Sequence, residues 1–102
     1  MNINLKAWKI ELPADAKEYI LEKIGRLEKY LGRVKAINCD VEIKRTVGSQ
    51  QSGEIYQAIV NLELPGKILR VEKVEKELLK AVDKVKDHLV RAIDKYKEHN
   101  LC

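Results

Sequence analysis

Apolar residues in the last third of the chain recur at the spacing of an α-helix, and this repeat constrains the fold more strongly than any other feature. The repeat consists of Leu78, Val82, Val85, Leu89, Ile93 and Tyr96. Apolar positions three and four residues apart form one continuous face of a helix. The sequence therefore predicts a helix from about Val74 to Glu98 that packs this face on a hydrophobic core.

Four shorter segments alternate apolar and polar residues, which is the pattern of strands with one buried face. They are approximately residues Ile3–Ile10, Ile37–Lys44, Tyr56–Leu64 and Ile68–Glu72. A second helix is expected from about Ala14 to Leu31, because Pro13 suits the residue before a helix and Gly32 suits the residue after one.

Two connections join the later strands. The polar, Gly-rich stretch from Thr46 to Gly53 is expected to be a loop, and Pro65-Gly66 a tight turn. The element order is then β-α-β-β-β-α. It predicts an α+β fold in which a four-stranded sheet has one polar face and both helices pack on the other, like a double-stranded-RNA-binding domain. Residues 1–102 are expected to form a single domain.

Composition limits the partners and the cellular compartment that are expected for this chain. Its net charge of +4 over 102 residues permits an anionic partner, such as nucleic acid or anionic lipid, without requiring one. There is no run of about 18 apolar residues and no signal-peptide core. The two cysteines, Cys39 and Cys102, do not make a disulfide framework. We therefore expect a cytoplasmic protein that does not associate with a membrane.

Basic side chains of the predicted C-terminal helix lie along one line. They are Lys80, Lys84, His88, Arg91 and Lys95. From Lys80 to Lys97, six Lys or Arg residues stand against three Asp, so the segment carries a surplus of +3. A rigid row of cations can follow a row of phosphates. The competing interpretation is a solvated face on which Asp87 and Asp94 pair with neighbouring cations.

The first helix has a weaker basic patch. Lys23 and Arg26 are three residues apart, and Glu22 and Glu28 dilute their charge. Alone, this is an ordinary polar face. If both helices pack side by side on one face of the sheet, the two basic patches border a shared groove, but periodicity does not establish that geometry.

No arrangement of residues in the sequence indicates catalysis. There is no Walker A motif, no GxGxxG and no nucleophile elbow. His88 and His99 are eleven residues apart, too far for one helix face to offer both to a metal ion. We expect no enzyme activity, metal, cofactor or small-molecule substrate. The outward face of the sheet is expected to lack stacking aromatic residues, which leaves the helices to bind any anion.

Two segments carry a resemblance to a known family. KIGRLEKYL, which contains Lys23 and Arg26, and AVDKVKDHLVRAIDKYK resemble the basic helices of the ribosome hibernation-promoting factor and ribosome-associated inhibitor family. The second segment is similar to the family's succession of Ala-Ile-Asp, Asp-Lys-Leu, Arg-Gln-Leu and Lys-x-Lys. LPGKILR resembles the family's turn before its fourth strand, so the likeness extends over nearly the whole chain.

The resemblance implies a ribosome-associated translation inhibitor. Family members bind rRNA of the small ribosomal subunit in the channel for mRNA and tRNA, and promote ribosome hibernation under stress or in stationary phase. Carried over residue by residue, it assigns rRNA binding to Lys23, Arg26, Arg91, Lys95 and Lys97. The line of basic residues described above adds Lys84 and His88 to this set.

The chain departs from the family pattern at three positions. His88 stands where the family usually has Lys, Ala92 where it has Gln, and Leu79 where it has Tyr. These changes remove one charge and two polar groups. The chain also resembles the short form of the family, without a second domain that joins ribosomes, so a monomer is expected.

Two other functions stay open at the level of sequence. One is a general module for structured RNA, because double-stranded-RNA-binding domains share the α-β-β-β-α order. The other is a protein-interaction regulator, for instance of a transcription factor, that uses the acidic residues of the sheet and does not bind RNA.

Overall fold

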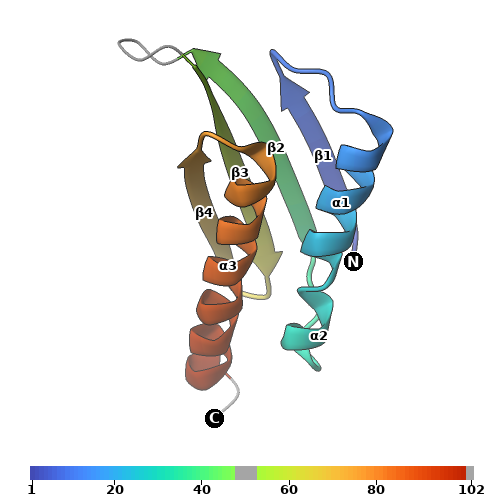
Figure 1. The fold of residues 1–102 in the computed structure, drawn as a ribbon. Helices are drawn as coiled ribbons and strands as arrows, with labels where there is room; N and C mark the ends of the chain where they lie inside the picture. The colour runs from blue at the N-terminus through green and yellow to red at the C-terminus, as the bar shows by residue number, and fades with distance from the viewer. Residues whose placement is uncertain (48–52, 101–102) are drawn as a thin grey trace.

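In a computed structural model, a four-stranded sheet carries three helices on one of its faces (Figure 1). The structure describes residues 1–47 and 53–100. The elements in chain order are β1 (Ile3–Trp8), α1 (Ala14–Gly25), α2 (Glu28–Leu31), β2 (Asn38–Val47), β3 (Glu54–Leu64), β4 (Lys67–Glu75) and α3 (Leu78–Asn100). The predicted α+β class, with helices on one side of the sheet, is confirmed.

The strands follow one another across the sheet in the order β1-β2-β3-β4. β1 pairs with β2 in parallel, with Leu5 opposite Val41, while β2–β3 and β3–β4 are antiparallel hairpins. The parallel pair requires a crossover, which α1 and α2 provide. α3 then returns over β3 and β4, so the two helical segments lie side by side (Figure 1).

The core lies between the sheet and the helices. Alternate residues of the strands and the apolar faces of α1 and α3 meet there, and Val41, Val60, Ile24, Leu89 and Ile93 are each no more than 1% exposed. Burying each such side chain stabilises the fold by roughly 1.5–3 kcal/mol. The apolar repeat of the last third therefore does what its spacing predicts: it docks α3 rigidly and leaves its other faces to polar residues.

The first helix is not continuous, and its predicted range of Ala14–Leu31 is wrong in this respect. α1 ends at Gly25, and a tight turn separates it from α2. In that turn the N–H of Leu27 donates to the carbonyl of Ile24 at 3.0 Å, a bond three residues back rather than four. Glycine weakens a helix at this point, and the turn keeps Leu27 and Leu31 buried.

Strand ends also differ from the prediction. β1 ends at Trp8 rather than Ile10, because Lys9 has a φ of 59°. β4 continues to Glu75, which pairs with Tyr56, so the C-terminal helix starts at Leu78 instead of Val74. β2 likewise extends through residues 46 and 47 of the predicted loop. Residues 48–52 of that loop lie outside the described residues.

Candidate nucleic-acid interface

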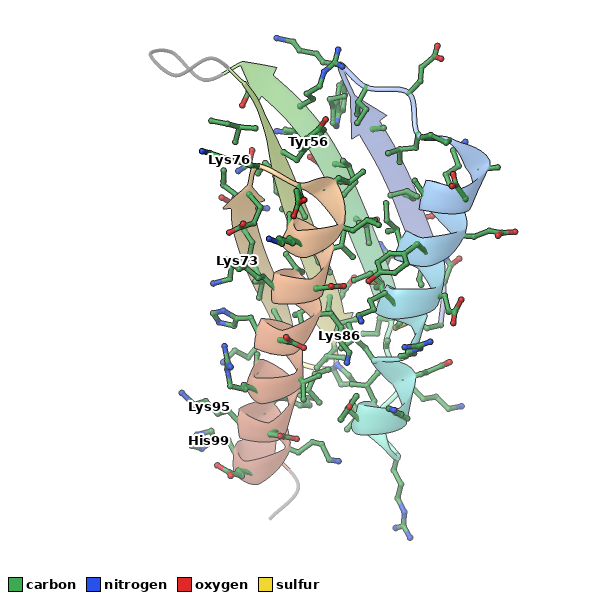
Figure 2. All side chains as sticks on the ribbon, in the orientation of Figure 1. Tyr56, Lys73, Lys76, Lys86, Lys95 and His99 are labelled. Atoms are coloured by element: carbon green, nitrogen blue, oxygen red, sulfur yellow. The ribbon has the colours of Figure 1, made fainter. Side chains whose placement is uncertain are left out.

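α3 presents its polar residues on two flanks, one on each side of its buried face. The first flank lies along the edge strand β4; we call it the β4 flank, and it consists of Lys84, His88, Arg91 and Lys95. The second faces α1 and α2; we call it the interhelical flank, and it consists of Asp83, Lys86 and Lys97. Figure 2 shows Lys95 and Lys73 on one side of α3 and Lys86 on the other, towards α1 and α2.

The upper part of the basic row is neutralised by carboxylates. Lys84 contacts Glu75 of β4, and Lys80 lies 3.0 Å from Glu77. The hydrogen bond from Lys84 lowers the pKa of Glu75, and the one between Lys80 and Glu77 raises the pKa of Lys80. Exposed ion pairs of this kind contribute little to stability, but they reduce the charge that this part of α3 offers to a ligand.

The lower part of the β4 flank keeps its positive charge. Arg91 and Lys95 are exposed, and no carboxylate within residues 1–47 and 53–100 forms an ion pair with either. Lys73 joins them from β4: it pairs with buried Ala58 in the sheet register, so its side chain is on the helical side of the sheet. Three lysine or arginine side chains from two elements therefore surround His88.

His88 is the residue at the centre of this group. Its Nδ1 is buried and has no hydrogen-bond partner among the described residues. Burial lowers the pKa of His88 below its ordinary value of 6.5, and the charges of Lys73, Arg91 and Lys95 lower it further. A site of this composition holds an excess of positive charge that an anion would relieve.

The interhelical flank is built differently, because its cations are tied to neighbouring groups. Lys23 lies 3.5 Å from Asp83, and Tyr19 donates a 2.7 Å hydrogen bond to the same carboxylate. That hydrogen bond raises the pKa of Tyr19. Lys97 donates to the backbone carbonyl of Tyr30 at 3.0 Å. These contacts fasten α1 and α2 to α3.

Aromatic contacts complete the interhelical flank. The Nζ atoms of Lys86 and Lys29 lie 5.6 and 5.3 Å from the ring centre of Tyr30, within the range of a cation–π interaction. Arg26 is also committed, since it forms a 2.7 Å ion pair with Glu22 one turn earlier. A ligand in this region would have to compete with these contacts.

The predicted site residues therefore fall into two groups. His88, Arg91 and Lys95 lie together on the β4 flank, with Lys84 paired to a carboxylate at its upper end. Lys23 and Lys97 lie on the other side of α3, and Arg26 pairs within α1. The shared groove that the sequence left open does not bring all seven together.

Sequence reasoning missed two basic residues. Lys73 occupies an inward position of β4, two residues after buried Val71. A charged residue at an inward position of a strand indicates that the strand has left the hydrophobic core at that point. Lys86 has a weaker signal, since it lies three residues after Asp83 on the flank that meets the first helix.

The outward face of the sheet is mainly polar, as expected, although Ile59, Ile68 and Val74 also lie on it and an aromatic residue stands at one corner. Asn4 donates to Asn38 and Asp40 at 2.9 and 3.1 Å, so side-chain hydrogen bonds tie β1 to β2 on this face. Trp8 lies on the same face, opposite Lys44 in the register, and is 52% exposed. The prediction that this face lacks a stacking aromatic residue is wrong at this corner.

The part of the chain that the structure describes contains no group of three or more His, Cys, Asp or Glu residues that is able to hold a metal ion. Within the same residues, no helix is both long enough and apolar enough to span a bilayer.

Solved structures with the same fold include proteins from Thermus thermophilus and Coxiella burnetii. The N-terminal domain of Protein Y from Thermus thermophilus superposes with a TM-score of 0.76 at 23% identity, covering 94% of this chain and 99% of that one. A ribosomal subunit interface protein from Coxiella burnetii gives a TM-score of 0.70 at 18% identity, covering 96% and 99%. These similarities establish the fold. No curated protein matches the sequence.

The family comparison covers almost the whole chain. Residues 3–100 match the Ribosomal S30AE profile, described as sigma 54 modulation protein / S30EA ribosomal protein. Proteins of this family are non-enzymatic modulators of the ribosome. The match includes both helices in which the resemblance was found. The chain is therefore a member of the S30AE family of ribosome-associated inhibitors.

Proposed function

We propose that this protein binds the small ribosomal subunit in the channel used by mRNA and tRNA and inhibits translation by occupying it. In this proposal it acts in the cytoplasm as a monomer and promotes ribosome hibernation under stress or in stationary phase. The family membership of the chain and its similarity to a ribosomal subunit interface protein support this function.

The observation that carries the proposal is the uncompensated charge on the lower β4 flank. Arg91 and Lys95 project from a helix that is docked by fully buried residues, and Lys73 adds a cation from the neighbouring strand. Phosphate contacts give affinity without reading bases, and structured RNA is recognised largely through its shape and backbone. A rigid scaffold that holds cations in place is sufficient for such binding.

Inhibition of translation then follows from the space that the bound protein occupies. The described fold measures about 49 × 27 × 17 Å along its principal axes, so a bound copy excludes other macromolecules from the space it fills. No chemical step is required. Lys23 and Lys97 serve mainly to hold the helices in register, and Arg26 and Lys86 reach RNA at the edge of the contact only by giving up their contacts with Glu22 and Tyr30.

Sedimentation with purified small subunits tests the proposal. Arg91→Glu with Lys95→Glu reverses two charges on the β4 flank. The matched control, Lys17→Glu with Lys35→Glu, reverses two charges on exposed lysines elsewhere. We expect the first variant to lose binding and the control to retain it. In the single variants Arg91→Ala and Lys95→Ala, the slope of log affinity against log salt should fall by roughly one unit each.

Three outcomes would contradict the proposed mode of binding, and a fourth would contradict the steric mechanism. Equal losses in the two double variants would reduce the effect to net charge. Equal affinity for free duplex RNA and for small subunits would favour a general structured-RNA module. No co-sedimentation at low salt would favour a protein-interaction regulator. If the protein binds but a reconstituted translation system initiates normally, the binding claim stands and the steric mechanism fails.

A further inference from the structure

Trp8 is unusual among the exposed apolar residues of this protein. It is the only tryptophan in the chain, and its side chain lies half exposed at the end of an edge strand. Ile3 and Leu5 pack against the core, so the alternation of β1 turns Trp8 to the opposite face of the sheet. Single exposed apolar residues are common and need no explanation; the surroundings of Trp8 are what set it apart.

Basic residues border Trp8 on more than one side. An open hollow of about 240 Å³ is lined by Trp8, Lys9, Lys44, Arg45 and Thr46. Lys44 lies 3.8 Å from Glu42 in an exposed and loose ion pair, which costs little to give up. Lys9 is the one residue other than glycine with positive φ in the described chain. Such backbone strain often accompanies functional positions, and here it carries Lys9 out of the strand beside the ring.

We propose that Trp8, Lys9 and Lys44 form a binding site for single-stranded nucleic acid, with one base stacked on the indole ring and phosphates on the two lysines. A flat apolar ring flanked by cations has the two features that single-stranded nucleic acids require, a stacking surface and an electrostatic track. The hollow is smaller than the roughly 300–1,000 Å³ typical of small-molecule sites, so its size suits one planar ring.

A protein partner fits this corner less well. The outward residues of β1 and β2 nearest to Trp8 are charged: Lys6 lies opposite Glu42, and Lys44 pairs with Glu42. A protein-docking surface usually offers a continuous apolar patch of several hundred Å², and Trp8 does not extend into one.

The site is separate from the β4 flank. Trp8 ends β1 opposite Lys44, near the end of β2, whereas the lower part of α3 lies towards the other end of a fold 49 Å long (Figure 1). The two surfaces also lie on opposite faces of the sheet. Binding of a single strand at Trp8 is therefore independent of binding to the ribosome, and either activity can be absent without the other.

Intrinsic fluorescence tests the inference directly, because the only tryptophan reports on the proposed contact. Oligo(U) and oligo(dT) should quench Trp8 emission in a saturable way, and the comparison between them distinguishes RNA from DNA as the source of the base. A duplex of the same length and inorganic polyphosphate should quench much less, since neither offers an unstacked base. No quenching by the single strands, or equal quenching by polyphosphate, would overturn the proposal.

Substitutions measured with a labelled oligonucleotide provide the second test. The background should be Arg91→Glu with Lys95→Glu, so that cations of α3 do not mask the effect. By anisotropy, Trp8→Ala should weaken binding about five- to hundredfold, and Trp8→Phe should retain most of it. Lys44→Ala should lower the salt dependence, whereas Lys35→Ala, an exposed lysine far from Trp8, should not. Equal affinities for Trp8→Ala and Trp8→Phe, with unchanged circular dichroism, would refute the stacking contact.

Discussion

The hydroxyl of Tyr19 donates a 2.7 Å hydrogen bond to the carboxylate of Asp83, and so joins α1 to α3 on the helical face of the sheet. Lys23 lies 3.5 Å from the same oxygen. One acidic residue of a helix rich in cations therefore has a structural role: it holds the two helical segments together. The basic residues of the interhelical flank depend on this alignment for their positions.

Removing the hydroxyl should destabilise the protein modestly. Tyr19→Phe deletes the hydrogen bond and leaves Asp83 with Lys23, so the free energy of unfolding should fall by about 1 kcal/mol. Urea denaturation followed by circular dichroism measures this difference. Tyr30→Phe is the matched control: Lys97 donates to the backbone carbonyl of Tyr30, and the substitution keeps that carbonyl. A similar loss of stability in both variants would argue against the Tyr19–Asp83 contact.

Lys73 should control the protonation of His88. The pKa of His88 is lowered by burial and by Lys73, Arg91 and Lys95. Lys73→Ala removes one of these charges and should move the pKa of His88 upward, towards 6.5. An NMR titration of the His88 ring protons reports the change, with His99 in the same spectrum as an internal reference. An unchanged titration of His88 would show that Lys73 is not close to it in solution.

Protonation of His88 should work in opposite directions on stability and on anion binding. Because its folded pKa is below 6.5, the unfolded chain binds more protons, so the contribution of neutral His88 to stability is full above pH 6.5 and is lost as the pH falls through the folded pKa. A bound phosphate favours the charged imidazole, so affinity for ribosomes should rise over the same fall in pH.

The variant His88→Lys separates these effects. It should abolish the pH dependence of ribosome binding between pH 7 and about 5.5 and raise affinity at neutral pH, because lysine is charged throughout. Sedimentation at several pH values and constant ionic strength is the measurement. Identical pH profiles for the wild type and the variant would mean that His88 does not face the anion.

Cys39 should be unreactive in the folded protein. Its side chain is fully buried, and burial raises the pKa of the thiol to about 11. In a Cys102→Ser background, a thiol reagent at pH 8 should therefore label Cys39 only at the rate at which the protein opens, and quickly in concentrated urea. Rapid labelling under native conditions would contradict the packing of β2 on the helices.

Two glycines should respond oppositely to alanine. At Gly66 the φ of 79° is strained for any residue with a Cβ, so Gly66→Ala should destabilise the β3–β4 turn by about 1 kcal/mol. At Gly25 a new Cβ would meet only Ile3 Cδ1 at an ordinary 4.0 Å, so Gly25→Ala should stabilise the protein by roughly 0.5–1 kcal/mol. Thermal unfolding compares the two. Equal effects would show that the break after α1 is required by something other than helix propensity.

Local sequence determined the classes of the elements and the faces that they bury. The spacing of Leu89 and Ile93 predicts a docked helix, and the alternation around Val41 and Val60 predicts strands with one buried side. Both predictions rest on the burial of apolar area, which is the dominant favourable contribution to the free energy of folding. Gly32, with a φ of 60°, ends the first helical region as its position in the sequence indicated. The row of cations on α3 also followed from helical geometry alone.

Tertiary structure decided what lies beside each of these residues. The break after Gly25 and the extension of β4 to Glu75 depend on turn geometry and strand pairing, which local propensity does not specify. The same is true of the site. Glu75 neutralises Lys84, and Asp83 neutralises Lys23. Strand pairing places Lys44 next to Trp8, and the docking of α3 brings His88 close to Lys73. Charge at a site is a sum over spatial neighbours, and only the folded chain determines which neighbours those are.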